Sequence, residues 1–300
     1  MKVRLLGIAA GGGVPQWNCA CRNCHLARAG RLPPLTQSSL AFSPDGATWY
    51  LVNATPDVTT QLARWPELWP LGLRSSPIHG IVLTDGELDH ILGLPHLREG
   101  AAWTLYATPS VAAMLEDDLR ILPALRRYGP VEVRPLSLDA PLVLGTPPES
   151  VEVFATPISS RSPRYAGGAS GGARDAVVAL ALANPTTGRR LVYAPCVGDL
   201  SPDLFRWCEG ADIVLFDGTF WADDELPRLG VASETARAMG HVPVGGPFGS
   251  HGWLADLPAR TKLYVHVNNT NPLLDPDSEE RAAVRALGLD VAREGWTVTL

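Results

Sequence analysis

A short apolar run that leads directly into a loop crowded with acidic side chains constrains this chain more than any other segment. The stretch Ile81–Leu94 begins with Ile-Val-Leu and then carries Asp85, Glu87, Asp89 and His90. If the loop is extended, its alternating carboxylates point the same way, and the imidazole follows directly. Such side chains suit a hard or borderline divalent ion such as iron, manganese or zinc. The alternative is a helix N-terminus whose acids favour the helix dipole, and spacing alone leaves both interpretations open.

The hydrophobic pattern predicts short strands, first in hairpins and then mixed with helices, in both halves of the chain. We expect strands at Lys2–Ile8, Ser38–Phe42, Thr48–Val52, Gly80–Leu83, Thr104–Ala107, Val151–Phe154, Ala176–Ala183, Arg190–Ala194, Ile213–Phe216, Lys262–Val267 and Asp290–Leu300. We expect helices at Asp57–Arg64, at Ser110–Leu122 with Ser110 as its N-cap, and at Ser278–Leu287. This order predicts an α/β (αββα) sandwich of two face-to-face sheets with helices outside, built as a single domain over residues 1–300.

Composition and charge argue against several classes of function. The formal net charge is −6 and no basic block stands out, so we expect no nucleic-acid partner. The apolar start of the chain is too short for a signal peptide, and no stretch approaches the roughly 18–20 apolar residues of a membrane span. We therefore expect a cytoplasmic protein without membrane insertion. In a reducing compartment its 5 cysteines are better explained as metal ligands or free thiols than as disulfides.

Three cysteines near the start of the chain form the second strong signal. Cys19, Cys21 and Cys24 have C-x-C-x-x-C spacing in a Gly-rich loop, which fits a tetrahedral structural zinc. A redox pair or chance clustering is the alternative. A closed zinc site needs a fourth ligand, and the sequence leaves its identity open. The candidates are His25, Cys196, Cys208, His241 and a group near Asn269.

The acidic loop resembles the metallo-β-lactamase superfamily signature T-H-x-H-x-D-H-x-x-G-L. The matching residues are Thr84, Asp89, His90, Gly93 and Leu94. The two leading histidines of the signature are replaced by Asp85 and Glu87. The resemblance implies the fold of that superfamily and a metal ion at the loop.

The later metal-binding motifs of the superfamily match only in part. The third should supply a histidine near Thr156–Tyr165, which contains none. The fourth resembles Tyr193–Cys196, with Cys196 in place of a bridging aspartate, and the fifth matches His266 well. The resemblance therefore implies one metal ion held by Asp89, His90 and His266, with open positions as in non-haem iron oxygenases, rather than a two-metal hydrolase. A core histidine at a strand end is the alternative for His266.

Longer blocks resemble the pyrroloquinoline quinone biosynthesis protein B family. They are residues 11–24, 53–57, 216–225, 239–243 and 268–272. This resemblance implies a role in making the redox cofactor pyrroloquinoline quinone from a Glu-Tyr unit. The implied chemistry is iron-dependent, oxygen-using hydroxylation of the tyrosine ring. The implied partners are this small tyrosine-derived substrate and other enzymes of the pathway. A zinc- or manganese-dependent hydrolase and a non-enzymatic carrier that aids cofactor transport are the alternatives.

Four further residues are predicted to assist the chemistry. Asp85 and Glu87 would lie beside the metal as hydrogen-bond acceptors or proton carriers. Asp217 and His241 are expected to pair, as the corresponding residues do in related tRNA-processing nucleases, because a carboxylate fixes the tautomer of an imidazole and tunes its pKa for proton transfer. A purely structural hydrogen bond is the equal alternative for this pair.

Overall fold

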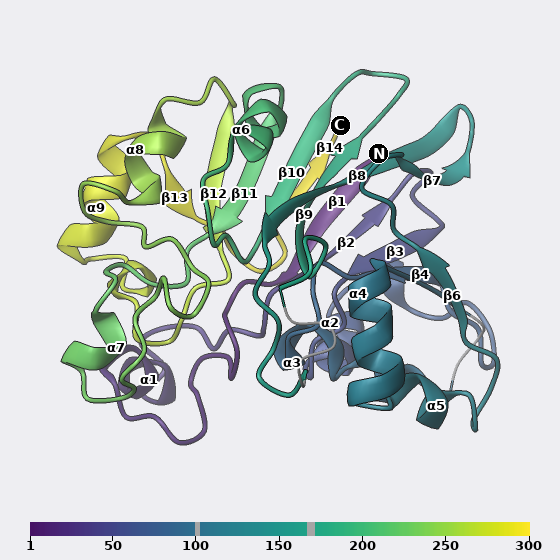
Figure 1. Ribbon diagram of the computed structural model, residues 1–300, viewed down its shortest axis with the longest axis horizontal. Coiled ribbons are helices and arrows are strands. Elements are labelled where there is room, and N and C mark those ends of the chain that lie inside the picture. The colour runs from purple at the N-terminus through teal and green to yellow at the C-terminus, as the bar shows by residue number, and fades with distance from the viewer. Residues whose placement is uncertain (100–102, 167–171) are drawn as a thin grey trace.

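A computed structural model describes residues 1–99, 103–166 and 172–300 and arranges them around two sheets (Figure 1). Within these residues each sheet has seven strands. The first sheet has the order β14 (Thr297–Thr299), β1 (Lys2–Gly7), β2 (Ser39–Ser43), β3 (Trp49–Val52), β4 (Ile78–Val82), β5 (Thr104–Ala107) and β6 (Glu132–Pro135). The second has the order β13 (Asp290–Val291), β12 (Thr261–Val265), β11 (Ile213–Asp217), β10 (Arg190–Ala194), β9 (Val177–Ala183), β8 (Glu149–Ser159) and β7 (Leu142–Thr146).

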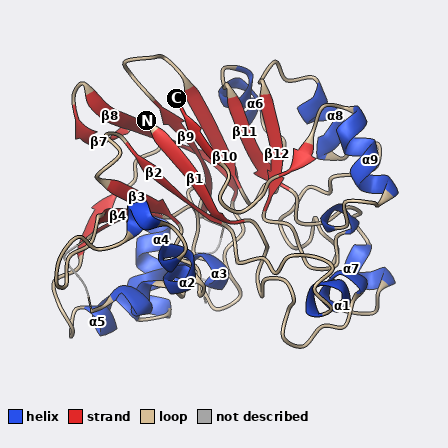
Figure 2. Cartoon of the chain, turned by 180° about the vertical axis from the view of Figure 1, so that it is seen from behind, coloured by secondary structure: helices blue, strands red, loops and turns tan. Residues whose placement is uncertain are grey.

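Helices cover the outer faces of both sheets, which confirms the predicted α/β sandwich (Figure 2). Those beside the first sheet are α2 (Val58–Ala63), α3 (Leu88–Ile91), α4 (Pro109–Ala113) and α5 (Ile121–Leu125). Those beside the second are α6 (Pro202–Glu209), α8 (Ser250–Ala255) and α9 (Glu279–Ala286). The short helices α1 (Arg22–Arg28) and α7 (Glu225–Arg228) lie next to each other at one end of the sandwich in both views.

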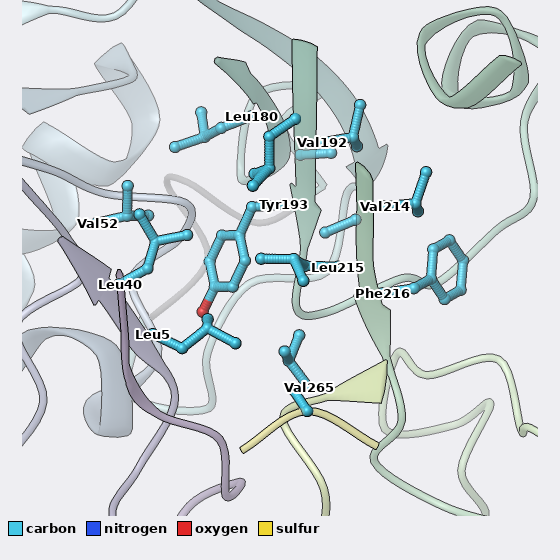
Figure 3. Packing of buried hydrophobic residues seen from close by; sticks show 14 of the residues in the cluster. Leu5, Leu40, Val52, Leu180, Val192, Tyr193, Val214, Leu215, Phe216 and Val265 are labelled. Atoms are coloured by element: carbon cyan, nitrogen blue, oxygen red, sulfur yellow. The ribbon is translucent and has the colours of Figure 1, made fainter. Parts of the chain in front are cut away.

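The core between the sheets is apolar, with one buried tyrosine at its centre. Tyr193 on β10 points from the second sheet toward Leu5 and Leu40 of the first (Figure 3). Its hydroxyl lies 2.9 Å from the Ser38 hydroxyl, so this buried polar group keeps a hydrogen-bond partner. Strand β9 reads VVALALA and is buried along its whole length, because it is covered on both faces.

The parallel strands determine where the loops that carry the candidate site residues lie. Strands β3, β4 and β5 are parallel in the first sheet, and β10, β11 and β12 are parallel in the second. The carboxyl ends of neighbouring parallel strands meet at one edge of a sheet, and ligands bind there in open α/β sheets. The loops that follow β4, β10, β11 and β12 are therefore brought to the same region between the two sheets.

Two strand predictions needed correction. The predicted strand Val151–Phe154 is present but too short, because it lies in the first half of the longer β8, which pairs with β7 and β9. The predicted strand Asp290–Leu300 is two strands, with β13 in the second sheet and β14 in the first. The chain crosses between the sheets at Gly295, whose φ is +81° and whose Cα lies so close to Trp65 that a Cβ would come within 2.3 Å of the indole. Only glycine fits that turn.

The predicted helix Ser110–Leu122 also needed correction. Its N-cap is Thr108, whose hydroxyl accepts from the Val111 amide, because Pro109 occupies the first helical position. After α4 the chain continues as a π-helical turn and is then interrupted at Arg120, which has a left-handed φ of 56°. The other predicted strands and helices are present, with ends that differ by one or two residues.

Candidate active site and metal centres

Hydrogen bonds to the neighbouring strand end fix the acidic loop after β4. The Asn53 side chain accepts from the Thr84 amide and donates to the Thr84 hydroxyl, and all these groups are buried. Gly93 packs so tightly on this segment that a Cβ would lie 2.2 Å from the Thr55 carbonyl oxygen. The glycine of the sequence signature is therefore a packing requirement that holds α3 against the sheet.

The expected alternation of three carboxylates along an extended loop was wrong in detail. Helix α3 begins at Leu88, so Asp89 and His90 lie in its first turn while Asp85 precedes it. The turn forms because the Asp85 carboxylate accepts from the Glu87 amide at 2.9 Å. All three carboxylates still line one cavity of about 450 Å³.

One ring nitrogen of His90 is hydrogen-bonded and the other has no hydrogen-bond partner among the described residues. Its Nδ1 lies 2.8 Å from both carboxylate oxygens of Asp85, so it donates there and leaves the Nε2 lone pair available. That Nε2 is fully buried and has no hydrogen-bond partner among the described residues. Burial lowers the pKa of His90, but the Asp85 and Asp89 carboxylates outweigh it and raise the pKa to about 9. A buried imidazole nitrogen that lies beside carboxylates and has no hydrogen-bond partner is suited to bind a metal ion.

Three donor atoms converge in front of this nitrogen. Oδ2 of Asp89 lies 3.1 Å from Nε2 of His266 and 4.0 Å from Nε2 of His90. The Sγ atom of Cys196 lies 3.8 Å from Nε2 of His266. Atoms bound at about 2.1 Å to one ion lie about 3.0–3.5 Å apart, so Asp89, His90 and His266 fit a divalent ion with small shifts.

His266 is held in an unusual backbone conformation at the end of β12. Its φ is 56°, a left-handed value that non-glycine residues seldom adopt and that is common at functional sites. The hydroxyl of Thr219 lies 2.8 Å from Nδ1 of His266 and donates to Oδ1 of Asp217 at 2.6 Å. Because the hydroxyl has then used its proton, it accepts from Nδ1 of His266, and the lone pair of Nε2 faces the other donors.

Asp217 and His241 pair as the sequence predicted. Nδ1 of His241 lies 2.7 Å from Oδ2 of Asp217, which also accepts from the Val197 amide. Burial lowers the pKa of His241, but the Asp217 carboxylate outweighs it and raises the pKa above the ordinary value. The ring of His241 stacks on that of His266 with centroids 5.5 Å apart, so the pair lies beside the candidate metal ligands.

Glu87 is the acidic residue least committed to hydrogen bonds with its neighbours. Burial, followed by repulsion from Asp85 and Asp89, raises the pKa of Glu87 to about 7. Its carboxyl group can therefore take up or release a proton near neutral pH, which suits the predicted proton carrier. The residue lines the same cavity as His241 and Phe220.

The cysteine cluster forms a second group of donors. Sγ atoms of Cys19, Cys21 and Cys24 lie within 4.8 Å of one another. The three cysteines were predicted to share a loop, but Cys24 lies in helix α1 and Cys21 is the residue that precedes it. Burial raises the pKa of Cys21 to about 11.

The structure selects one of the candidates for the fourth position. The side-chain nitrogen of Asn269 lies 3.3 Å from Sγ of Cys24 and 3.5 Å from Sγ of Cys21. Rotation of this amide by 180° turns its oxygen toward the same two sulfurs. We call the donors Asp89, His90 and His266 the first cluster. Of the other candidates for the fourth position, Cys196 and His241 lie beside this cluster, His25 is exposed and Cys208 is buried within α6.

The sequence analysis missed two residues that shape the first cluster. Thr219 connects Asp217 to His266, and its position two residues after Asp217 within one of the family-like blocks was the available signal. Arg161 lines the cavity from the loop after β8, where no motif singles it out.

Comparison with known proteins agrees with this architecture. A family described as the β-lactamase superfamily domain matches residues 48–267. The chain is 40% identical over 304 residues to coenzyme PQQ synthesis protein B of Klebsiella pneumoniae, covering 100% of this chain and 98% of that protein. It is 42% identical over 306 residues to the protein of the same name from Azoarcus sp. (strain BH72), with 100% of both chains covered.

Solved structures give the same result. The 1.98 Å crystal structure of Zn(2+)-bound PqqB from Methylobacterium extorquens is similar over 100% of both chains, with 43% identity and a TM-score of 0.90. A diphosphatase from the PhnP family shares only the fold, at 18% identity and a TM-score of 0.68, with 99% of this chain and 96% of that one covered. No helix in the described part of the chain has the length and hydropathy needed to cross a bilayer.

Proposed function

Because the chain belongs to the coenzyme PQQ synthesis protein B family of the metallo-β-lactamase superfamily, we propose that it is a metal-dependent oxygenase of pyrroloquinoline quinone biosynthesis. Its substrate is a precursor derived from Glu-Tyr, and its reaction is hydroxylation of the tyrosine ring. One oxygen atom of dioxygen enters the ring and the other leaves as water, with two electrons taken from an external reductant. The observation that carries the proposal is the set of donors formed by Asp89, His90 and His266, of which Asp89 and His266 line the cavity and His90 is fully buried beside them.

The donor set favours one ion over two. The carboxylate of Asp85, which replaces a histidine of the superfamily signature, is occupied by Nδ1 of His90 and is not free to hold a second ion. Two histidines and one carboxylate leave coordination positions open for small molecules. Iron(II) bound there supplies redox chemistry with dioxygen that protein side chains lack.

The chain's own residues orient these ligands. Asp85 accepts from Nδ1 of His90, and Thr219 accepts from Nδ1 of His266, so both imidazoles present Nε2 to the ion. Such outer hydrogen bonds fix the tautomer and raise the basicity of a ligand. Asp217 supports the arrangement because its two oxygens accept from Thr219 and His241.

His241 and Glu87 are suited to move protons at the substrate. Asp217 holds Nδ1 of His241 protonated, which leaves Nε2 as an acceptor on the cavity side. Glu87, with a pKa raised to about 7 by burial, is the second acceptor. We assign these two groups to take the phenolic proton and the ring proton that hydroxylation releases.

The cysteine cluster is proposed to hold a structural zinc ion. Three thiolates and the amide oxygen of Asn269 fill four positions and leave none for substrate. Asn23 adds a second link, because its side chain donates to the carbonyl oxygens of Asn269 and Asn271. The zinc would thus tie α1 to the loop that carries His266.

Anaerobic reconstitution tests the proposal. The purified protein is loaded with Fe(II), supplied with a Glu-Tyr dipeptide and excess ascorbate as the two-electron reductant, and exposed to oxygen. The products are measured by mass spectrometry. We expect a gain of one oxygen atom on the ring. No ring hydroxylation by fully loaded protein would overturn the oxygenase assignment.

The same preparation distinguishes the alternatives. Hydrolysis of a phosphodiester by the zinc- or manganese-loaded protein would favour a hydrolase. Tight binding of pyrroloquinoline quinone without turnover would favour a carrier. Retention of the product until a second enzyme of the pathway is added would identify that enzyme as a partner.

A further inference from the structure

One guanidinium in the wall of the active cavity has no ion-pair partner. Arg161 follows β8, is half-buried and lines the same cavity as the acidic loop. Within residues 1–99, 103–166 and 172–300, no carboxylate lies within 4.0 Å of its side-chain nitrogens, although Glu87 is near enough to feel its charge. An arginine that is partly withdrawn from water and left unpaired is a ready receptor for an anion.

The structure makes room for this side chain. Its stem passes over Gly240, where a Cβ would lie 3.2 Å from Cδ of Arg161, and the φ of Gly240 is +86°. The backbone amide of Arg161 donates to the Ser159 hydroxyl at 3.1 Å. Further along the loop the Tyr165 hydroxyl donates to the Gly86 carbonyl oxygen. The backbone is therefore held on both sides of Arg161, which limits the loop motion that binding of a ligand would have to restrict.

A neighbouring arginine shows the contrast. Arg164 lies on the same loop, but its side chain is 75% exposed and is already bonded to Glu234. Its charge is neutralised and hydrated, so it offers little to a ligand. The cavity thus holds the carboxylates, two of the candidate metal ligands and the unpaired charge of Arg161.

We propose that Arg161 binds a carboxylate of the substrate and thereby holds its phenol ring toward Asp89, His90 and His266. The inference rests on the proposed function, which it deepens by assigning a residue to the acid groups of a Glu-Tyr-derived ligand. It specifies that the substrate is an anion recognised at two points, the phenol at the metal ligands and a carboxylate at Arg161. A neutral phenol of similar size lacks the carboxylate and therefore cannot bind Arg161.

Binding to the zinc-loaded protein, which supports no oxygen chemistry, tests this directly. Calorimetry compares glutamyl-tyrosine with its counterpart in which both carboxylates are amides. We expect the wild-type protein to bind the acid about 10–100-fold more tightly, the range for a charge-assisted hydrogen bond at a partly buried site. Arg161→Gln should lose this preference and leave the amide affinity unchanged. Arg161→Lys should keep part of it, because an ammonium retains charge but not the bidentate fork.

Arg164→Gln is the matched control and should bind both ligands within about twofold of the wild type. Retention of the full preference by Arg161→Gln, with unchanged zinc content and circular dichroism, would overturn the inference.

If iron-loaded protein fails to hydroxylate the dipeptide but zinc-loaded protein shows the Arg161-dependent preference, the proposed reaction fails and the subsite stands. If hydroxylation proceeds in Arg161→Gln with an unchanged KM, the subsite fails and the reaction stands. No binding of either ligand by wild type would overturn both.

Discussion

The two donor clusters lie close together along the chain yet are built on opposite principles. His266 belongs to the first cluster and Asn269, three residues later, to the second. In the first cluster each histidine has Nδ1 held by another side chain, His266 lines the cavity, and Nε2 of His90 is buried without a hydrogen-bond partner among the described residues. In the second the donors contact one another, and one of them, Cys24, is fully buried. An open set of ligands serves reaction, whereas a closed set serves structure.

The two clusters should contribute differently to the stability of the fold. The cysteines join α1 to a loop some 250 residues away, so a zinc ion there closes a long segment of chain. The first cluster joins the loops after β4 and β12, which the two sheets already bring together. Metal removal should therefore affect stability mainly at the second cluster and activity mainly at the first.

His266→Ala should produce the largest effect and is the strongest test of the separation. Loss of this ligand should abolish metal binding at the first cluster and lower hydroxylation by at least about 1,000-fold, equivalent to about 4 kcal/mol. One equivalent of zinc should stay on the cysteines, as measured by elemental analysis. His251→Ala is the control, because His251 contacts the Val244 carbonyl outside the cluster. Loss of both metals from His266→Ala would show that the clusters are not independent.

Cys24→Ala should reverse the pattern. The variant should lose the structural zinc and, at free zinc about 1,000-fold above the Kd, about 4 kcal/mol of unfolding free energy. Urea denaturation with and without zinc measures this difference. Cys208→Ala is the matched control, because it removes a buried thiol that is not near the cluster and should leave the zinc-dependent part of stability intact. An equal response to zinc in both variants would contradict the assignment.

Asp85→Asn tests whether the hydrogen bond from His90 to Asp85 strengthens metal binding at the first cluster. The amide keeps the shape of the carboxylate but removes the charge that holds Nδ1 of His90 protonated. We expect the affinity of the first cluster for its metal to fall about 10–100-fold, while zinc on the cysteines is retained. Competition with a chromophoric chelator gives both constants. Asp57→Asn, which changes an acceptor of Gln37 outside the cluster, should have no effect on either metal.

The family resemblance, more than local spacing, predicted that Asp89, His90 and His266 belong together, and the structure brings these three residues close to one another. The Asp217–His241 contact was predicted from resemblance and is present at 2.7 Å. What the sequence could not supply is the tertiary context that leaves Arg161 unpaired, because that depends on which carboxylates other loops bring near it.

Several incorrect or missing predictions of strands and helices also concern features that depend on tertiary packing. Asp290–Leu300 has strand-like composition throughout, but the crossing between sheets is set by packing of Gly295 on Trp65. The short elements β6, β7 and α8 were not predicted, since each is held by neighbours more than by its own pattern. Helix α6 was also not predicted, although Ser201 as its N-cap and Pro202 at its first position were available signals. The fourth position at the cysteines stayed open for the same reason, because only the folded loop after β12 brings Asn269 to α1.

Asn269 gives the smallest expected effect and the finest test of the contrast between open and closed sites. A neutral amide oxygen is a weaker zinc ligand than a thiolate or an imidazole, so Asn269→Ala should lower zinc affinity only about tenfold, with water taking the fourth position. Asn269→His should instead tighten binding, because an imidazole at this position completes a Cys₃His set. Zinc competition measures both changes, and metal at the first cluster should be unaffected. If the alanine and histidine variants match the wild type, the side chain of Asn269 is only a hydrogen-bond donor to the thiolates, and the fourth ligand must come from solvent.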